Sequence, residues 1–112
     1  MIQRVLAIDG DTMGRGDEAL GGRLMVKFIH QLPGVSDRPH AIVFYNTGVR
    51  LLADRSVVLD TLRQLEHDGV ELLACGTCVA HFGLETRLAA GRVTDMREIA
   101  ATLTGAERVV RI

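Results

Sequence analysis

The sequence of 112 residues is poor in several features, and each scarcity excludes a class of protein. It has no tryptophan and only 4% aromatic residues, so aliphatic side chains must fill its core. No apolar run approaches the length of a membrane span, and the apolar start of residues 1–9 is cut off by charge too early for a signal peptide. The formal net charge of −1 provides no bulk attraction to nucleic acid. We therefore expect a cytoplasmic protein that binds neither nucleic acid nor a membrane.

Cysteine is also scarce, because the chain has only two. With 47% hydrophobic residues, a chain of this length can bury a core without disulfide bridges. Two cysteines in a reducing cytosol favour free thiols, a metal site or a catalytic site over a structural bridge. Both belong to the motif Cys75-Gly76-Thr77-Cys78, which is therefore the main functional signal of the chain.

Strand-like and helix-like segments alternate along the chain without a repeat or a linker, which predicts a single domain over residues 1–112. The expected strands are 5–8, 41–45, 70–74, 92–93 and 108–112. The expected helices are 17–31, a segment capped by Ser56 and ended by Gly69, a shorter one after Cys78 that ends before Gly91, and one that Thr94 or Asp95 caps and Gly105 ends. Such alternation implies right-handed crossovers and a sheet covered on both faces. We expect a three-layer α/β/α sandwich with a mostly parallel sheet of four or five strands.

Apolar side chains recur at helical spacing in three of these helices, and the spacing predicts the faces that pack on the sheet. The predicted inward residues are Leu20, Leu24, Phe28 and Leu32 in the first helix, Leu59, Leu62 and Leu65 in the second, and Met96, Ile99 and Leu103 in the last.

The loops after three of the strands should open on one edge of the sheet, where ligands of open α/β folds bind. They are the glycine-rich segment 9–16, the turn 46–48 and the CxxC motif. The candidate pocket residues in these loops are Gly14, Gly16, Asn46, Thr47, Gly48, Gly76 and Thr77. Asn46 and Thr47 can bind a substrate or hold the CxxC loop, although an Asn-x-Gly segment also forms an ordinary turn.

The CxxC motif at a strand end allows three uses. One sulfur can carry a persulfide that the other resolves, the pair can cycle between dithiol and disulfide, or the two can supply half of a metal site. A helix that starts at the motif would lower the pKa of a thiol. Zinc needs four ligands, and His81 extends the motif to only three, so we expect no metal and no cofactor. The remaining alternative is two cysteines that pack as small apolar side chains.

Two further features near this edge allow both a functional and an ordinary interpretation. Residues 14–19 match the dinucleotide fingerprint G-x-G-x-x-G/A, but the loop is acidic and no acid follows the second strand to bind a ribose. Tight-turn glycines explain the match equally well. Arg15 and Arg50 can attract an anionic persulfide, or they are solvated charges.

Four motifs in order along the chain resemble one family. They are Gly14-Arg15-Gly16-Asp17-Glu18, Phe44-Tyr45-Asn46-Thr47-Gly48-Val49, Gly69-Val70-Glu71-Leu72 ahead of the CxxC, and Gly91-x-Val93-Thr94-Asp95-Met96. Together they resemble the DsrE/DsrF-like family, and most closely the DsrE-like domain of the selenium-metabolism protein YedF. The resemblance implies a DsrE/DsrF-like α/β/α fold and a sulfurtransferase-like role in a sulfur relay. It also implies a homo-oligomer, a trimer or a hexamer.

The resemblance further implies roles for the two cysteines and a partner. Cys75 stands where related subunits have the carrier cysteine, so it is the expected persulfide acceptor, and Cys78 is the expected resolving thiol. The chain begins at its first strand without a TusA-like domain, so a TusA-like sulfur carrier or another persulfide donor is expected as a separate partner. The chalcogen can be sulfur or selenium. Two alternatives remain, namely a non-catalytic oligomeric partner-binding module of the same fold and a dithiol redox protein.

Overall fold

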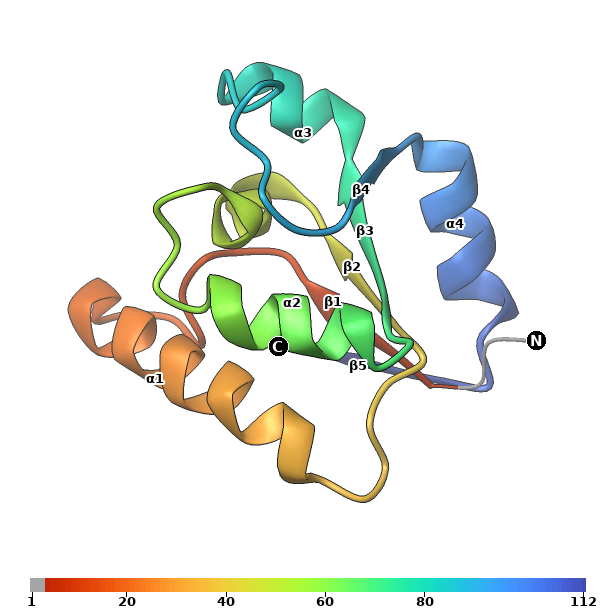
Figure 1. The fold of residues 1–112 in the computed structure, drawn as a ribbon, viewed down its shortest axis with the longest axis horizontal. Coiled ribbons are helices and arrows are strands. Elements are labelled where there is room, and N and C mark those ends of the chain that lie inside the picture. Colours follow the sequence, from red (N-terminus) through yellow and green to blue (C-terminus); the bar gives the residue numbers. More distant parts are fainter. Residues whose placement is uncertain (1–3) are drawn as a thin grey trace.

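The computed structural model of the protein describes residues 4–112 (Figure 1). The strands are β1 (Arg4–Ile8), β2 (Ala41–Phe44), β3 (Glu71–Cys75), β4 (Arg92–Thr94) and β5 (Arg108–Arg111). The α-helices are α1 (Glu18–Gln31), α2 (Leu59–His67), α3 (Gly76–His81) and α4 (Met96–Gly105), and two 3-10 helices are η1 (Leu32–Gly34) and η2 (Asn46–Leu52). Nowhere in residues 4–112 is a helix long and apolar enough to cross a bilayer.

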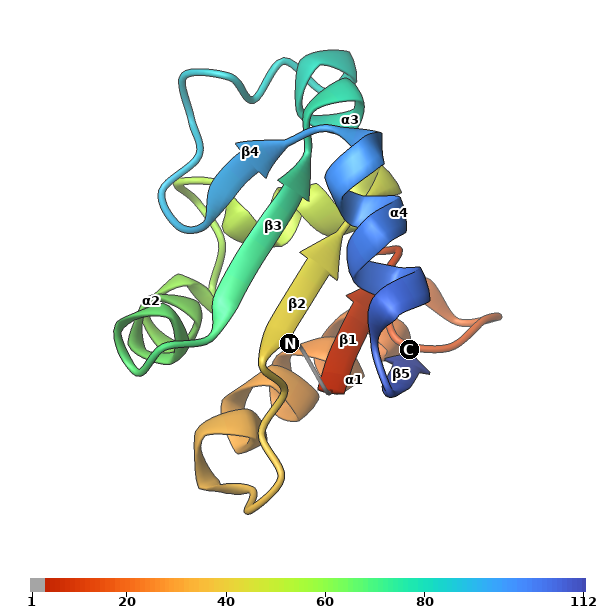
Figure 2. The same cartoon turned by 90° about the vertical axis from the view of Figure 1, so that its right-hand side faces the viewer.

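The strands form a five-stranded sheet in the order β4-β3-β2-β1-β5, and every neighbouring pair is parallel. The carboxyl ends of β2 and β3 point toward the side of the molecule that carries α3 (Figure 2). The predicted parallel sheet is therefore confirmed, with all five strands present.

Side chains of successive strand residues alternate between the two faces of the sheet, and each face has its own core. The larger core joins strand residues to α1, α2, η2 and α3, and its members include Leu6, Ile42, Phe44, Leu72, Met25, Ile29, Leu62, Leu65, Val49 and Val79. The smaller core lies under α4 and contains Val5, Ala7, Ala41, Val43, Leu73, Cys75 and Ile99. Helices thus cover both faces, which confirms the predicted three layers.

The predicted inward face of α1 is wrong at its first two positions. Leu20 and Leu24 are 45% and 40% exposed, whereas Gly21, Met25 and Ile29 are buried. The buried stripe has the same four-residue spacing and is displaced by one residue. At the start of this stripe, a Cβ on Gly21 would lie only 2.9 Å from Cβ of Thr12, so glycine lets the preceding loop pack against the helix.

The other helices match their predicted faces in part. Leu62 and Leu65 of α2 are buried, but the Ser56 hydroxyl accepts from the Val58 N–H, ahead of the first residue of the helix. Asp95 caps α4 as predicted, because its carboxylate accepts from the Glu98 N–H at 2.9 Å. Ile99 is buried and Leu103 is partly buried in α4, whereas Met96 is 54% exposed.

The prediction of a helix after Cys78 is wrong in its bounds. α3 starts at Gly76, ahead of Cys78, and ends at His81. Gly83 adopts φ +65°, a left-handed conformation that stops the helix, and Leu84 N–H then donates to the Val79 carbonyl. Most of the segment from there to Gly91 is loop.

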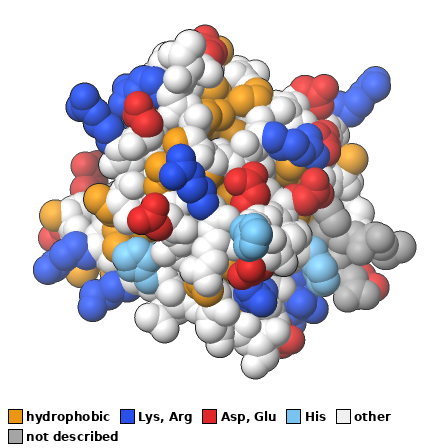
Figure 3. All heavy atoms as spheres, in the orientation of Figure 1, with side chains coloured by type: hydrophobic (Ala, Val, Ile, Leu, Met, Phe, Trp, Pro, Cys, Tyr) orange, Lys and Arg blue, Asp and Glu red, His pale blue; other side chains and the backbone are white. Residues whose placement is uncertain are grey.

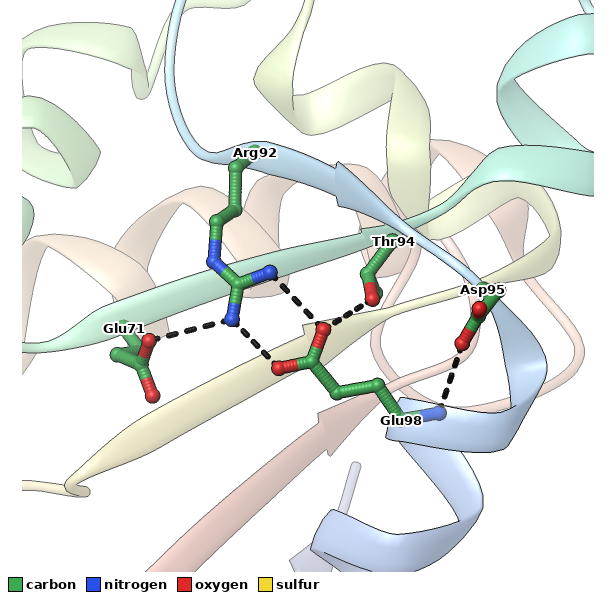
Figure 4. Close-up of polar contacts among 5 residues, drawn as sticks. All are labelled: Glu71, Arg92, Thr94, Asp95 and Glu98. Atoms are coloured by element: carbon green, nitrogen blue, oxygen red, sulfur yellow. Dashed lines mark hydrogen bonds and ion pairs between the residues drawn. The ribbon is translucent and has the colours of Figure 1, made fainter.

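An ion-pair network fastens the start of α4 to the edge strand β4 (Figure 4). The Arg92 guanidinium donates to both carboxylate oxygens of Glu98, at 2.9 and 2.6 Å, and to Glu71 at 3.3 Å. The Thr94 hydroxyl also donates to Glu98. The bonds from Arg92 and then from Thr94 lower the pKa of Glu98 to about 2. The network links the start of α4 to β4, while Ile99 packs the helix over the smaller core that contains Cys75.

Gly48 permits the closest backbone approach around the carboxyl edge of the sheet. A Cβ at this position would lie 2.4 Å from the Ile8 carbonyl oxygen and 3.3 Å from the Gly10 nitrogen, both of which are backbone atoms. No side chain can turn away to relieve such a clash. The segment that follows β2 can therefore contact the end of β1 only because residue 48 is glycine.

On the surface that Figure 3 shows, basic and acidic side chains are interspersed, with apolar side chains between them. This mixture agrees with the near-zero formal net charge of −1.

We expect the Glu98 carboxyl to titrate near pH 2 in the native protein, and the Arg92→Met substitution to raise this pKa toward the ordinary glutamate value of about 4.3. Because the folded-state pKa is lowered, the stabilisation is complete above the unfolded-state pKa and is lost as the pH falls through the folded-state value. The stability difference between wild type and Arg92→Met should therefore shrink as the pH falls from about 4.3 to about 2. Carboxyl-detected NMR measures the pKa, and an ordinary glutamate pKa in the wild type would contradict the network.

We expect Gly48→Ala to reduce the free energy of unfolding by about 1–3 kcal/mol, because the added methyl group meets backbone atoms. Gly22→Ala is the matched control, since a Cβ on this α1 residue has no neighbour within 4 Å. Alanine there should be neutral or stabilise the helix by up to about 1 kcal/mol. Urea denaturation compares the two variants, and equal effects would refute the steric argument.

Candidate functional site

The CxxC motif lies at the junction between β3 and α3. Cys75 is the last residue of the strand and the N-cap of the helix, with φ −64° and ψ 119°. Gly76 then begins the helix, where a Cβ would lie 3.1 Å from the Thr94 carbonyl oxygen and 3.2 Å from Cγ1 of Val93. The glycine thus lets the end of β4 approach the turn that carries both cysteines.

The two free thiols differ in exposure. Cys75 is only 1% exposed and packs in the smaller core with Leu73 and Ile99. Cys78 is partly buried and touches both cores, because α3 lies at the end of the sheet where the cores meet. A molecule that approaches from solvent therefore reaches Cys78 before Cys75.

Asn46 contacts the CxxC motif through its backbone. Its N–H lies 3.0 Å from Sγ of Cys78 and donates to it. Asn46 has φ +52°, and its side-chain oxygen accepts from the Thr47 N–H at 2.8 Å. The sequence indicated that Asn46 lies near the motif but not that the backbone makes the contact. The sequence signal for this turn is that asparagine tolerates a left-handed backbone conformation.

Thr47 connects this turn to the loop that follows β1, since its hydroxyl accepts from the Asp11 N–H at 3.2 Å. The first loop therefore does reach the predicted edge, but through Asp11. Gly14 and Gly16 are exposed, have φ +82° and +113°, and a Cβ at either would have no neighbour within 4 Å. Among the hydrogen bonds of residues 4–112, none joins these two glycines to the cysteines.

The structure therefore assembles only part of the predicted pocket. Around the two cysteines it brings together Asn46, Gly76 and, through their turn, Thr47 and Gly48. Thr77 is an exposed residue of α3 between the cysteines. Gly14 and Gly16 shape the turn into α1, so their structural role is the tight turn that the sequence also allowed.

The pKa of the Cys78 thiol is raised above its ordinary value. Burial is the main cause, the neighbouring Cys75 thiol adds to it, and the Asn46 N–H opposes it. The expected activation of the thiol does not prevail for Cys78, because desolvation of the thiolate dominates over the lowering by the Asn46 N–H. The resting Cys78 is therefore mainly the protonated thiol at neutral pH.

His81 does not complete a metal site with the cysteines. Its ring packs edge-on against Phe82, with centroids 4.9 Å apart and an interplanar angle of 86°. Within residues 4–112, no three side chains of His, Cys, Asp or Glu gather closely enough to hold a metal ion. What the arrangement provides is two adjacent thiols, one of them accessible, with a backbone N–H aimed at that sulfur.

Comparison with solved structures supports the fold. The chain is similar to the protein of unknown function MTH1491 from Methanobacterium thermoautotrophicum, with 20% identity, a TM-score of 0.71 and 100% of both chains covered. It is also similar to the ychN protein from E. coli, with 16% identity, a TM-score of 0.73 and 100% of both chains covered. BT1422 from Bacteroides thetaiotaomicron, a conserved protein of unknown function, has 15% identity and a TM-score of 0.56 over 96% of this chain and 94% of its own.

Identities this low show a shared fold alone, and no curated protein matches the sequence. The sequence model of the DsrE/DsrF-like family, however, matches residues 9–112. The match includes both cysteines, the turn at Asn46 and the carboxyl ends of β2, β3, β4 and β5. The chain therefore belongs to the DsrE/DsrF-like family.

Proposed function

We propose that the protein is a sulfurtransferase-like sulfur carrier that holds a persulfide on its CxxC motif. The observation that carries the proposal is the pair of neighbouring thiols at the end of β3, of which Cys78 is accessible and receives the Asn46 N–H. Membership of the DsrE/DsrF-like family, which suggests a role related to sulfur relay, agrees with this chemistry.

The transfer needs no external oxidant. The Cys78 thiolate attacks the terminal sulfur of a donor persulfide, R–S–SH, and forms a new S–S bond as the donor bond breaks. The donor leaves as a thiolate, which takes up a proton. An acceptor thiolate then removes the sulfur in the same way. Alternatively, the Cys75 thiolate attacks Cys78 Sγ, forms a disulfide and releases hydrosulfide, and a cellular thiol must then reduce the disulfide.

We assign the first encounter with the donor to Cys78 and the resolving role to Cys75, which reverses the order that the sequence favoured. The reason is access, because Cys75 is 1% exposed beneath α4. The Asn46 N–H further supports the assignment, since it stabilises negative charge on the Cys78 sulfur during exchange. Persulfide labelling of single-cysteine variants distinguishes Cys78 from Cys75 as the first acceptor.

The proposal includes a partner and an assembly. A TusA-like sulfur carrier, or another persulfide donor protein, would supply the sulfur in the cytoplasm, and selenium could replace sulfur in a domain of the YedF type. We also propose a homo-oligomer, a trimer or a hexamer. Exposed apolar side chains on α1 and on the edge strand β5 support contacts between copies, and they include Leu20, Leu24 and Val110.

Two other functions have an observation in their favour. A dithiol redox protein is supported by the contact between the two thiols, through which Cys75 raises the pKa of Cys78. A non-catalytic partner-binding module is supported by the same exposed apolar side chains on α1 and β5. Neither alternative requires a stable sulfur adduct, so adduct formation distinguishes both from the carrier.

We expect Cys75→Ala to gain the mass of one sulfur atom after incubation with a low-molecular-weight persulfide, and the wild type to gain it until Cys75 attacks Cys78 and forms the disulfide. Cys78→Ala should not gain it, because it lacks the accessible thiol. Intact mass spectrometry under non-reducing conditions measures the gain, and thermal unfolding verifies that both variants are folded. An adduct on Cys78→Ala but not on Cys75→Ala would restore the order predicted from the sequence. If none of the three proteins forms an adduct, the carrier is refuted.

We expect the alkylation rate of Cys78 to rise with pH, with a midpoint above the ordinary cysteine pKa, because burial disfavours the thiolate. Cys75→Ala should move the midpoint down, since the neighbouring thiol raises the pKa of Cys78. Iodoacetamide labelling followed by peptide mass spectrometry gives the rate at each pH. A wild-type midpoint below that of free cysteine would contradict a Cys78 pKa raised by burial.

A further inference from the structure

A second surface feature lies beside the carboxyl end of α3 and takes no part in the chemistry of the two thiols. It is a hollow of about 320 Å³ whose lining includes Arg50, Arg55, Arg87, Ser56 and Phe82. This volume falls at the lower end of the range of small-molecule sites, about 300–1,000 Å³. Its lining comes from η2, the segment that follows η2, and the residues after α3, and the bridge between Ala53 and Leu88 joins the last two segments.

The lining carries three guanidinium groups and no carboxylate, unlike the mixed surface of Figure 3. Within residues 4–112, Arg55 has no acidic partner among the ion pairs. Arg50 lies 3.7 Å from an Asp11 oxygen, too far for a hydrogen bond. Arg87 directs two nitrogens to a single oxygen of Asp54. Positive charge therefore exceeds the negative charge that neighbouring side chains offer.

The existing ion pairs do not prevent a ligand from binding. The side chains of the Arg50–Asp11 pair are 50% and 37% exposed, and those of the Arg87–Asp54 pair are 44% and 50% exposed. Exposed pairs of this kind are weak, and a ligand anion can compete for the guanidinium groups. Each arginine has five N–H donors, so Arg87 retains donors beyond those used for Asp54.

Phe82 and Ser56 provide the other elements of a binding site. The Arg50 guanidinium carbon lies 4.4 Å from the centroid of the Phe82 ring, which occupies one face of the guanidinium and leaves the donors on its edge. The Ser56 oxygen accepts from the Val58 N–H at 3.3 Å, so its hydroxyl hydrogen remains able to donate. Planar guanidinium donors match the geometry of carboxylate and phosphate oxygens.

We infer that the hollow binds a small ligand that bears an oxyanion, either a carboxylate or a phosphate. The site lies about one helical turn from the reactive thiol, because the Phe82 N–H donates to the Cys78 carbonyl oxygen at 3.1 Å. The inference does not depend on sulfur transfer, since binding requires only the charge and shape of the lining.

Titration of the full chain with inorganic phosphate, and separately with succinate, tests the inference. The ionic strength is kept constant with sodium chloride, and amide chemical shifts are followed by NMR. We expect saturable shifts at Arg55, Ser56 and Phe82 with at least one probe, and the probe that saturates identifies phosphate or carboxylate as the preferred group. Arg55→Gln should weaken binding about tenfold, because it removes a charged donor. Arg87→Gln should weaken it in the same direction.

Arg97→Gln is the matched control, since it removes an exposed arginine of α4 that does not line the hollow. This variant should bind as the wild type does. The inference is overturned by two results, namely a linear, non-saturating response to both probes or an equal loss of affinity in Arg97→Gln and Arg55→Gln. Urea denaturation of each variant ensures that the comparison is made between folded proteins.

Discussion

The geometry of the thiol site depends on the close approach between Gly48 and the end of β1. Since a Cβ at residue 48 would lie 2.4 Å from the Ile8 carbonyl oxygen, only glycine allows η2 to begin directly after β2. The Thr47 hydroxyl can then accept from Asp11, and the Asn46 N–H can donate to Cys78. The absence of a side chain at Gly48 therefore allows the Asn46 N–H to reach the Cys78 sulfur.

The difference between the two cysteines follows from how the sheet is covered. α4 packs Ile99 into the same small core as Cys75, and the bonds from Arg92 to Glu98 hold the start of that helix against β4. Cys78 lies one helical turn beyond the strand end, where coverage is incomplete. Adjacent thiols in one motif thus acquire different access, and a buried thiol beside an exposed one suits a resolving role better than a receiving one.

Patterns within a single segment were sufficient to predict β1, β2 and β3, because their continuous apolar runs are typical of strands buried on both faces. The faces of α1 were not predictable in this way. Its buried stripe begins with Gly21, whose contribution is the absence of a side chain, and hydrophobic periodicity does not register it. η2 and the early start of α3 were also missed, since both depend on contacts with distant strands. At the site, parallel topology predicted that Asn46 and the cysteines share an edge, whereas the N–H to sulfur bond requires coordinates.

The thiol site and the arginine-lined hollow share two short elements, η2 and α3. η2 begins at Asn46, which contacts Cys78, and it also contains Arg50; α3 contains Cys78 and is followed at once by Phe82. The stacking of Arg50 on Phe82 therefore joins η2 to α3 at one end, while the Asn46 to Cys78 bond joins them at the other. Any displacement of η2 relative to α3 must change both contacts, so the position of the reactive sulfur and the shape of the hollow depend on one arrangement of two short helices.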